Sequence, residues 1–291
     1  MVHPIETVEV GAQVSAYLDD TYLEQVDTRV IAVGEKDGTP WAAVERSPFH
    51  PQGGGRPADR GWLEDTEIIP VRDRESGLVV AMVPQGGSLP ALAEGQKVRA
   101  RIDLQARTAH AALHTAGHLV EAVGRMQGWE MVASNHFPGQ ARIEFQAPRT
   151  DPRLADPEGR EEVTAALRAA VAAAVADDLP VFARCLADGR RVVHLDELHS
   201  APCGGTHVRG LGDLAEVALP TLKVKKGRVR VSYTATHAPY AAPDVPYAAT
   251  HVSRAEPHVS RTAPHARYAA APHAPYAAEP HVSATATHRS H

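Results

Sequence analysis

The sequence predicts an α+β protein: a small antiparallel β-barrel at residues 1–103, then an α+β domain at residues 104–235 with helices packed on an antiparallel sheet. The first stretch consists of short alternating runs between glycine- and proline-rich turns, whereas the second mixes two long helical patterns with strand-like segments. At residues 236–291 the composition changes abruptly. We therefore expect a disordered tail after the two domains.

Strand-like runs and turns alternate through the predicted barrel. The runs are "RVIAVGE", "WAAVER", "EIIPVRD", "GLVVAMV" and "KVRARID", and they are separated by segments such as "DGTP", "QGGGRPADRG" and "LAEGQ". Short strands with Gly/Pro turns at intervals of about ten residues are typical of a small antiparallel barrel.

The second region contains two helical patterns. "LQARTAHAALHTAGHLVEAVGRMQG" places apolar residues at helical spacing and ends at Gly128, which predicts a long helix with a glycine stop. "PEGREEVTAALRAAVAAAVADDLP" starts with acidic residues, is rich in alanine and ends before Pro180. The strand-like segments of this region are "QARIEFQAP", "VFARCL", "RVVHL" and "TLKVKKGRVRVSY".

The C-terminal segment is repetitive and poor in large apolar residues. It contains no Leu, Ile, Phe, Met or Trp, and "HAPYAA" and "EPHVS" each occur twice. Such a segment buries too little apolar area to offset the entropy lost on ordering. We interpret it as a repeat-expanded linker, with loose metal binding by its histidines as the alternative.

Charge and cysteine content narrow the classes of function. The formal net charge of −5 gives no general attraction to nucleic acid, so phosphate binding would need a local basic patch. No apolar run approaches the length of a membrane span, and the start "MVHPIETVEVGAQ" has no signal-peptide pattern. With Cys185 and Cys203 as its only cysteines, the chain is expected to be cytoplasmic, although a bridge between them stays open. Cys185, in an apolar run, is expected to be a buried thiol.

Two distant pairs of residues suggest a metal site. His114 and His118, in "HTAGH", lie one helical turn apart on the same face, although a packed, hydrogen-bonded pair has the same spacing. Cys203 and His207 flank the glycines of "CGGTH", which allow a tight turn. Together they form the nitrogen and sulfur set of tetrahedral Zn²⁺. His110, one turn before His114, is expected to lie outside the ligand set.

The number of ligands decides what such an ion can do. Four protein ligands normally make a closed structural site, whereas three leave a position for a water molecule of lowered pKa, which is then a candidate nucleophile. A site with four ligands can still orient a substrate by expanding its coordination or releasing one ligand. The sequence leaves both arrangements open.

The order of these motifs resembles a known family. "HTAGH" followed by "CGGTH" is similar to the editing domain of alanyl-tRNA synthetases and of their free-standing relatives, the AlaX proteins. "SPFHPQGGGRPADRGWL", "SNHFPGQARIEF" and "DDLPVFARCL" also follow the family's order, so the resemblance covers about residues 1–232. It implies that the zinc ligands are His114, His118, Cys203 and His207. The sequence departs at Gly117, where many synthetase editing domains have threonine.

The resemblance implies an ATP-independent hydrolase that acts in trans on mischarged tRNA. Its substrate would be the ester that joins serine, and also glycine, to tRNA(Ala), with the aminoacylated acceptor end as the partner. An alanine pocket cannot exclude smaller glycine by size and discriminates poorly against the added hydroxyl of serine, so a second site must remove the errors. No adenylate-forming catalytic region fits in this chain.

Several polar residues near the motifs are candidates for substrate contacts. Thr115 and Thr206 lie inside the ligand motifs, where a hydroxyl can recognise the side chain of serine. His136 and Gln140 lie at the start of the following strand, where either can position water or the terminal ribose. Local packing of Thr115 and a surface turn at His136 and Gln140 explain the same residues equally well. Gly53, Gly54 and Gly55 allow close approach of the backbone to a ligand, or form a plain turn.

A basic hairpin is expected near the end of the second domain. If Lys226 and Gly227 form its turn, one face carries basic side chains and the other carries Val224, Val229 and Val231. The basic face, which can hold tRNA phosphates or remain simply solvated, comprises Lys223, Lys225, Arg228 and Arg230.

Two alternatives to the deacylase remain: a noncatalytic tRNA-binding module with a structural zinc, and a zinc hydrolase for another acyl ester.

Overall fold

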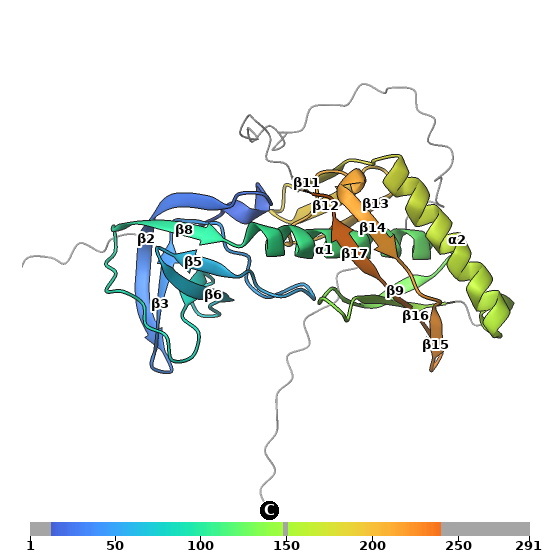
Figure 1. Ribbon diagram of the computed structural model, residues 1–291, viewed down its shortest axis with the longest axis horizontal. Coiled ribbons are helices and arrows are strands. Elements are labelled where there is room, and N and C mark those ends of the chain that lie inside the picture. Colours follow the sequence, from blue (N-terminus) through green and yellow to red (C-terminus); the bar gives the residue numbers. More distant parts are fainter. Residues whose placement is uncertain (1–12, 148–150, 240–291) are drawn as a thin grey trace, which may run out of the picture. The chain divides into compact units, whose positions relative to one another are not determined.

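The computed structural model describes residues 13–147 and 151–239, which belong to one compact unit (Figure 1). Two hydrophobic cores lie in this part of the chain, one inside the N-terminal barrel and one around the first long helix. The predicted tail lies outside the described residues from residue 240 onward. The domain limits stay predictions, although the last described strand continues to His237, into the segment assigned to the tail.

The predicted N-terminal barrel is confirmed. All its strand pairs are antiparallel, and it closes in the order β2-β3-β7-β6-β5-β8. Each of the five predicted runs overlaps one barrel strand. The strands are β2 (Gln25–Lys36), β3 (Thr39–Val44), β5 (Gly61–Leu63), β6 (Thr66–Arg72), β7 (Val79–Met82) and β8 (Lys97–Ile102).

Strand β5 lies at the end of a stretch that the sequence predicts as a loop. Its three residues are too few to show an alternating pattern, yet they pair with both β6 and β8 and so close the barrel. Shorter elements flank the long strands β2 and β3. Strand β1 (Val14–Ser15) pairs in parallel with β4 (Arg46–Ser47), and η1 (Ala16–Leu18) is a single 3₁₀ turn.

Helix α1 (Leu104–Met126) follows the barrel directly. Asp103 caps it by accepting a hydrogen bond from the Ala106 N–H at 2.9 Å, and Gly128, with a φ of 76°, follows its end as predicted. Every residue from 111 to 124 is buried. The helix runs through the second region between its sheets (Figure 1), so polar side chains on it are held away from water.

Helix α2 (Pro157–Ala176) is the second predicted helix. Asp156 is its N-cap and Pro157 takes the first helical position, where the missing N–H has no cost. The 3₁₀ turn η2 (Pro152–Leu154) precedes α2. The apolar side chains Val163, Leu167 and Val171 of α2 join the second core.

Antiparallel strands surround α1, which confirms the predicted α+β class. One sheet has the order β15-β16-β10-β9 and a second the order β11-β12-β13, while β14 pairs with β17. The bounds are β9 (Glu130–Asn135), β10 (Arg142–Gln146), β11 (Val181–Cys185), β12 (Arg191–Leu195), β13 (His199–Pro202), η3 (Leu211–Asp213), β14 (Leu214–Ala218), β15 (Lys223–Lys225), β16 (Arg228–Ser232) and β17 (Thr234–His237).

The expectation for Cys185 is wrong. Its side chain is exposed, because the residue ends β11, the outer strand of its sheet, where the chain turns toward β12. Its apolar neighbours in the sequence misled the prediction. Neither α1 nor α2 has the length and apolar character that a membrane-spanning helix requires.

A buried ion pair joins the glycine-rich loop of the first region to α1. Arg107 donates from Nε to Asp59 Oδ1 at 2.8 Å and from Nη2 to Asp59 Oδ2, and both side chains are almost fully buried. Arg107 also donates to the carbonyl of Pro48 at 2.6 Å. Since His114 lies two turns further along the helix, this pair fixes the loop relative to the candidate site.

Candidate metal centre

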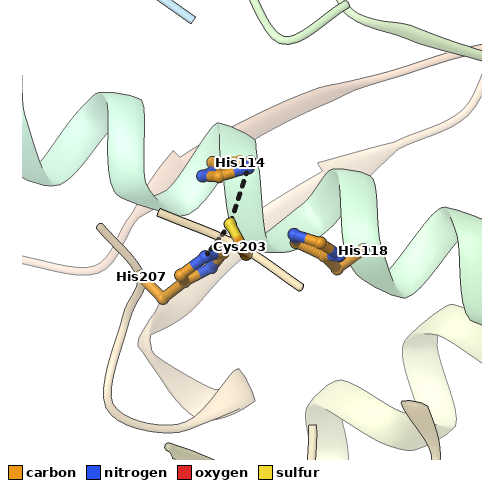
Figure 2. Close-up of side chains that lie close together, drawn as sticks. All are labelled: His114, His118, Cys203 and His207. Carbon is orange, nitrogen blue, oxygen red and sulfur yellow. Dashed lines mark hydrogen bonds between the residues drawn. The ribbon is translucent and has the colours of Figure 1, made fainter. Parts of the chain in front are cut away.

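The two predicted pairs of ligands meet. His114 and His118 project from α1, and Cys203 and His207 lie in the loop that follows β13 (Figure 2). One ligand atom of each of the four residues lies within 4.8 Å of the others. The three histidines are buried, and Cys203 is partly buried. The group can therefore hold a metal ion.

The contacts indicate which atom of each side chain faces the centre. Cys203 Sγ lies 3.3 Å from His207 Nε2 and 3.7 Å from His114 Nε2 (Figure 2). His207 Nδ1 lies 3.1 Å from Thr115 Oγ1, which leaves its Nε2 for the centre. The buried His118 Nε2 has no hydrogen-bond partner among the described residues. A metal ion would satisfy this atom.

Burial keeps the imidazoles of this group in the neutral state that a metal requires. Burial first, and then the neighbouring histidines, hold the pKa values of His114 and His207 well below the usual range. Burial also lowers the pKa of His118 to about 3. Burial raises the pKa of the Cys203 thiol, although the Gly205 N–H, Arg191 and Arg56 counteract it. The imidazoles are thus neutral, and a bound cation would supply the charge that favours the thiolate.

Gly205 is required for a reason that the sequence does not reveal. The prediction invoked a tight turn, but neither Gly204 nor Gly205 has a positive φ. A side chain at Gly205 would overlap the ring of His114, so only glycine lets this loop approach α1. Arg191 fixes the loop by donating from Nη1 to the carbonyls of Cys203 and Gly205, at 2.8 and 3.0 Å.

Two residues that sequence reasoning missed support His118. Its Nδ1 lies 3.4 Å from His199 Nε2 and 3.9 Å from Glu121 Oε2, and Glu121 Oε1 accepts a 2.7 Å hydrogen bond from Arg125. Ligand atoms of His118, Glu121 and His199 also lie within 4.8 Å of one another. Glu121 was detectable as the residue three positions after His118 on the same helix face. His199 carries no sequence signal, because only tertiary folding brings β13 to α1.

His136 lies beside the centre, immediately after β9. Its ring centroid is 4.7 Å from that of His114, and its Nδ1 is 2.5 Å from the hydroxyl of the buried Tyr233. Burial, together with Arg56, lowers the pKa of His136 to about 4, and burial raises the pKa of Tyr233, so both side chains are neutral near pH 7. Tyr233 was not a candidate in the sequence.

The two threonines of the ligand motifs are fully buried and hydrogen-bonded. Thr115 Oγ1 donates to the Ala111 carbonyl at 2.9 Å and accepts from the Val208 N–H at 3.2 Å. Thr206 Oγ1 accepts a 2.6 Å hydrogen bond from Arg56 Nη1. Gln140, in contrast, is exposed in the turn before β10 and lies outside the buried group.

The glycine-rich loop reaches His136. Gly54 and Gly55 have φ values of 57° and 73°, a conformation that favours glycine. The carbonyl of Gly55 accepts a 2.7 Å hydrogen bond from the His136 N–H, whereas Gly53 is exposed. Of the three predicted glycines, Gly55 is therefore the one in direct contact with a residue of the centre.

The basic hairpin has the predicted geometry. Lys226 and Gly227, with φ values of 51° and 76°, form its turn, and Val229 and Val231 are buried. Cross-strand pairing puts Lys223 opposite Arg230 and Lys225 opposite Arg228, all four exposed. Their role in binding stays a prediction.

No family model matches the chain, but curated proteins of similar sequence are found. The chain is similar to alanyl-tRNA editing protein AlaX-M of Saccharolobus solfataricus, at 27% identity over 75% of this chain and 97% of that protein. It is also similar to AlaX-L of Pyrococcus horikoshii, at 24% identity over 75% of this chain and 57% of that protein. An alanine–tRNA ligase of Methanothrix thermoacetophila is 30% identical over 74% of this chain and 25% of the ligase.

The chain thus spans little more than half of AlaX-L and a quarter of the ligase. Its fold, its buried His/Cys group and these relatives define the class: a barrel and α+β protein related to part of the alanine–tRNA ligases. Within that class, the relatives named AlaX-M and AlaX-L support an AlaX-family protein.

Proposed function

We propose that this protein is a zinc-dependent aminoacyl-tRNA deacylase that hydrolyses Ser-tRNA(Ala), and also Gly-tRNA(Ala), in trans in the cytoplasm. The relatives named as alanyl-tRNA editing proteins support an editing role. The observation that carries the chemistry is the convergence of ligand atoms of His114, His118, Cys203 and His207 within 4.8 Å.

Zinc is the ion that this donor set favours. Imidazole nitrogens and a thiolate suit Zn²⁺, whereas Mg²⁺ and Ca²⁺ prefer oxygen ligands. The unpartnered Nε2 of His118 and the neutral state of the buried imidazoles fit this assignment. When bound, the ion would polarise the ester carbonyl or lower the pKa of a water molecule.

The polar residues around the centre then have separate tasks. Thr115 holds His207 through Nδ1, so that Nε2 faces the metal. Thr206 holds Arg56 against the ligand loop. Tyr233 occupies Nδ1 of His136, which leaves Nε2 to contact the substrate. We assign the recognition of the serine hydroxyl to His136, and no role to the exposed Gln140.

The acceptor end of tRNA(Ala) would be held outside the metal centre. The four basic side chains of the β15–β16 hairpin offer a cationic surface to the phosphates, despite the negative net charge of the whole chain. Gly53 and Gly54, which have open space around them, allow the backbone of the glycine-rich loop to approach the terminal nucleotide.

Deacylation of one tRNA(Ala) charged with serine, glycine or alanine tests this function. We expect the wild-type protein and Cys185→Ser to hydrolyse the serine ester fastest, the glycine ester next and the alanine ester least, and Cys203→Ala to be inactive. Cys185 is the matched control because its thiol is exposed and outside the centre. Binding of tRNA without hydrolysis by the wild type would refute the enzyme and support the noncatalytic tRNA-binding module.

A further inference from the structure

Arg56, in the glycine-rich loop, is a buried cation that uses only one side of its guanidinium. Its side chain is 1% exposed. Nη1 donates to the Thr206 carbonyl at 3.1 Å and to Thr206 Oγ1 at 2.6 Å. Nε and Nη2 are buried and have no hydrogen-bond partner among residues 13–147 and 151–239.

The unused atoms form the edge with which arginine binds two oxygens at once. The N–H bonds of Nε and Nη2 are parallel and match two oxygens carried by one atom. Arg107 in this protein uses the same edge to hold both carboxylate oxygens of Asp59. The equivalent edge of Arg56 thus has the geometry of an anion-binding fork.

Among the residues that the structure describes, no carboxylate accepts a hydrogen bond from this edge. Asp59, the buried carboxylate nearest in the loop sequence, is already engaged by Arg107 and by the His50 N–H. Burial lowers the pKa of Arg56, but only to about 10, so the side chain remains a cation near pH 7. An unpaired buried cation is destabilising, and a bound anionic group would offset this cost.

The fork lies beside the metal centre. Thr206, which holds Arg56, precedes the ligand His207 in the loop. A side-chain carbon built on Gly205 would overlap the ring of His114 and lie 3.4 Å from Arg56 Nη1, so ring and guanidinium border the same space. Gly55, the residue before Arg56, accepts a hydrogen bond from the His136 N–H.

We propose that the Nε/Nη2 edge of Arg56 binds the two oxygens that share the reacting carbon of the substrate. The inference rests on the proposed deacylase function. The oxygen of water adds to the ester carbon, and the electron pair of the carbonyl double bond moves onto the carbonyl oxygen. The electron pair on the carbonyl oxygen then re-forms the double bond, the bond from carbon to the ribose oxygen breaks, and the ribose oxygen leaves with the electrons of that bond and takes up one proton of the water. The second proton of the water is released to solvent, which leaves the carboxylate.

Once water has added, the carbonyl oxygen and the oxygen of the water both stay on the carbon, first in the tetrahedral species and then in the amino-acid carboxylate. Negative charge grows on them as the reaction proceeds, so the fork stabilises the transition state more than the neutral ester. A phosphodiester also presents two oxygens, but it carries a nucleotide on each side and needs an open groove. The reacting carbon lies at the terminus, which suits the buried position of Arg56.

Kinetics of zinc-loaded full-length variants test the proposal. For Arg56→Met we expect kcat for Ser-tRNA(Ala) to fall about 10²- to 10³-fold while KM changes less than about threefold. Arg56→Lys keeps the charge but not the fork, and should recover only part of the loss. The control is Arg60→Met, in the same loop, because Arg60 is exposed and pairs with Glu67 on the surface; its kcat should be unchanged.

Three results would overturn the proposal. A raised KM with unchanged kcat would make Arg56 a phosphate-binding residue. An unchanged kcat in Arg56→Met would mean that the fork holds only water. Loss of zinc or of folding in both Arg56→Met and Arg56→Lys, measured by metal analysis and thermal unfolding, would make the role structural.

A binding measurement separates this inference from the proposed function. The ¹⁵Nε–H signal of Arg56 should shift on adding L-serine, which has the product carboxylate, but not on adding L-serinamide, which lacks it. Arg56→Met should weaken serine binding at least about tenfold. If the wild type fails to deacylate but serine still shifts the signal, the function fails and the fork stands. If serine leaves the signal unchanged and kcat does not depend on Arg56, the fork is refuted.

Discussion

Gly117 of α1 provides the space that the ring of His136 occupies. Any side chain at position 117 would overlap Cε1 and Nδ1 of that ring and the hydroxyl of Tyr233. Many synthetase editing domains, which this chain resembles, have threonine at this position. In this protein the hydrogen-bonded pair of His136 and Tyr233 fills the space that a side chain at position 117 would need.

Gly117→Thr should accordingly destabilise the protein by about 1–3 kcal/mol, because the new side chain displaces a packed ring. The double variant Gly117→Thr, His136→Ala should recover part of this loss, since it removes the overlap with the ring but not that with the Tyr233 hydroxyl. Urea unfolding measures both. Gly204→Ala, at a glycine with open space around it, is the control and should be near neutral. Equal destabilisation of the single and double variants would contradict the argument.

Glu121 should determine how tightly His118 holds the metal. Its Oε2 faces His118 Nδ1 and His199 Nε2, where its negative charge favours the cation and fixes the orientation of the ring. We expect Glu121→Gln to weaken Zn²⁺ binding about 10- to 100-fold in competition with a chelator. Glu130→Gln, at an exposed carboxylate in β9, should bind zinc as the wild type does. An unchanged affinity in Glu121→Gln would exclude this role.

The buried pair of Arg107 and Asp59 should matter for stability far more than a surface pair. Arg107→Met leaves the Asp59 carboxylate buried without its partner, and we expect a loss of about 3–5 kcal/mol in the free energy of unfolding. Adding Asp59→Asn should restore part of it. The exposed pair of Arg60 and Glu67 is the comparison, where Arg60→Met should leave the free energy of unfolding nearly unchanged. Similar losses at both sites would disprove the importance of burial.

His50 should make the metal-free protein sensitive to acid. Burial first, and then Arg56 and Arg107, lower its pKa to about 3 from the model-peptide value of 6.5. Between these pH values the unfolded chain binds a proton that the folded chain does not, so the free energy of unfolding falls as the pH falls. The slope for one proton is about 1.4 kcal/mol per pH unit. The free energy of unfolding of His50→Gln should depend on pH less steeply than that of the wild type, by the slope of about one proton. Equal slopes in the two proteins would refute this assignment.

The basic hairpin should act through long-range charge. Lys223→Glu with Lys225→Glu should raise KM for charged tRNA and make its dependence on salt concentration shallower, because fewer counterions are released on binding. The hydrolysis rate at saturating substrate should not change. Lys97→Glu, at an exposed lysine of the barrel, is the control. If KM depends on salt in the same way in the double hairpin variant and in Lys97→Glu, the hairpin is only a solvated surface.

The parts of this structure that follow local rules could be predicted from the sequence. The spacing of His114 and His118 is one helical turn, and the turn residues Lys226 and Gly227 fix the register of the hairpin. The ligand pairs and most barrel strands follow from such patterns. Strand β5 could not be predicted in this way, because three residues are too few to show an alternating pattern and its partner β8 is distant in the sequence.

The surroundings of the centre could not be predicted, because tertiary contacts create them. Arg56 reaches Thr206 across 150 positions of the sequence, and His118 lies 81 positions from His199. Nothing in the local sequence distinguishes a surface arginine in a glycine-rich loop from one that is buried against a ligand loop. The exposed Cys185 makes the opposite point, since an apolar stretch at the edge of a sheet does not guarantee burial.

Removal and return of the metal tests the central claim most directly. The full-length protein is stripped of metal with a chelator, reloaded with Zn²⁺, and assayed for hydrolysis of Ser-tRNA(Ala). We predict that activity disappears on stripping and returns with one equivalent of Zn²⁺ in the wild type and in Cys185→Ser, but not in Cys203→Ala. Full activity in the stripped protein, or recovery by Cys203→Ala, would contradict the account.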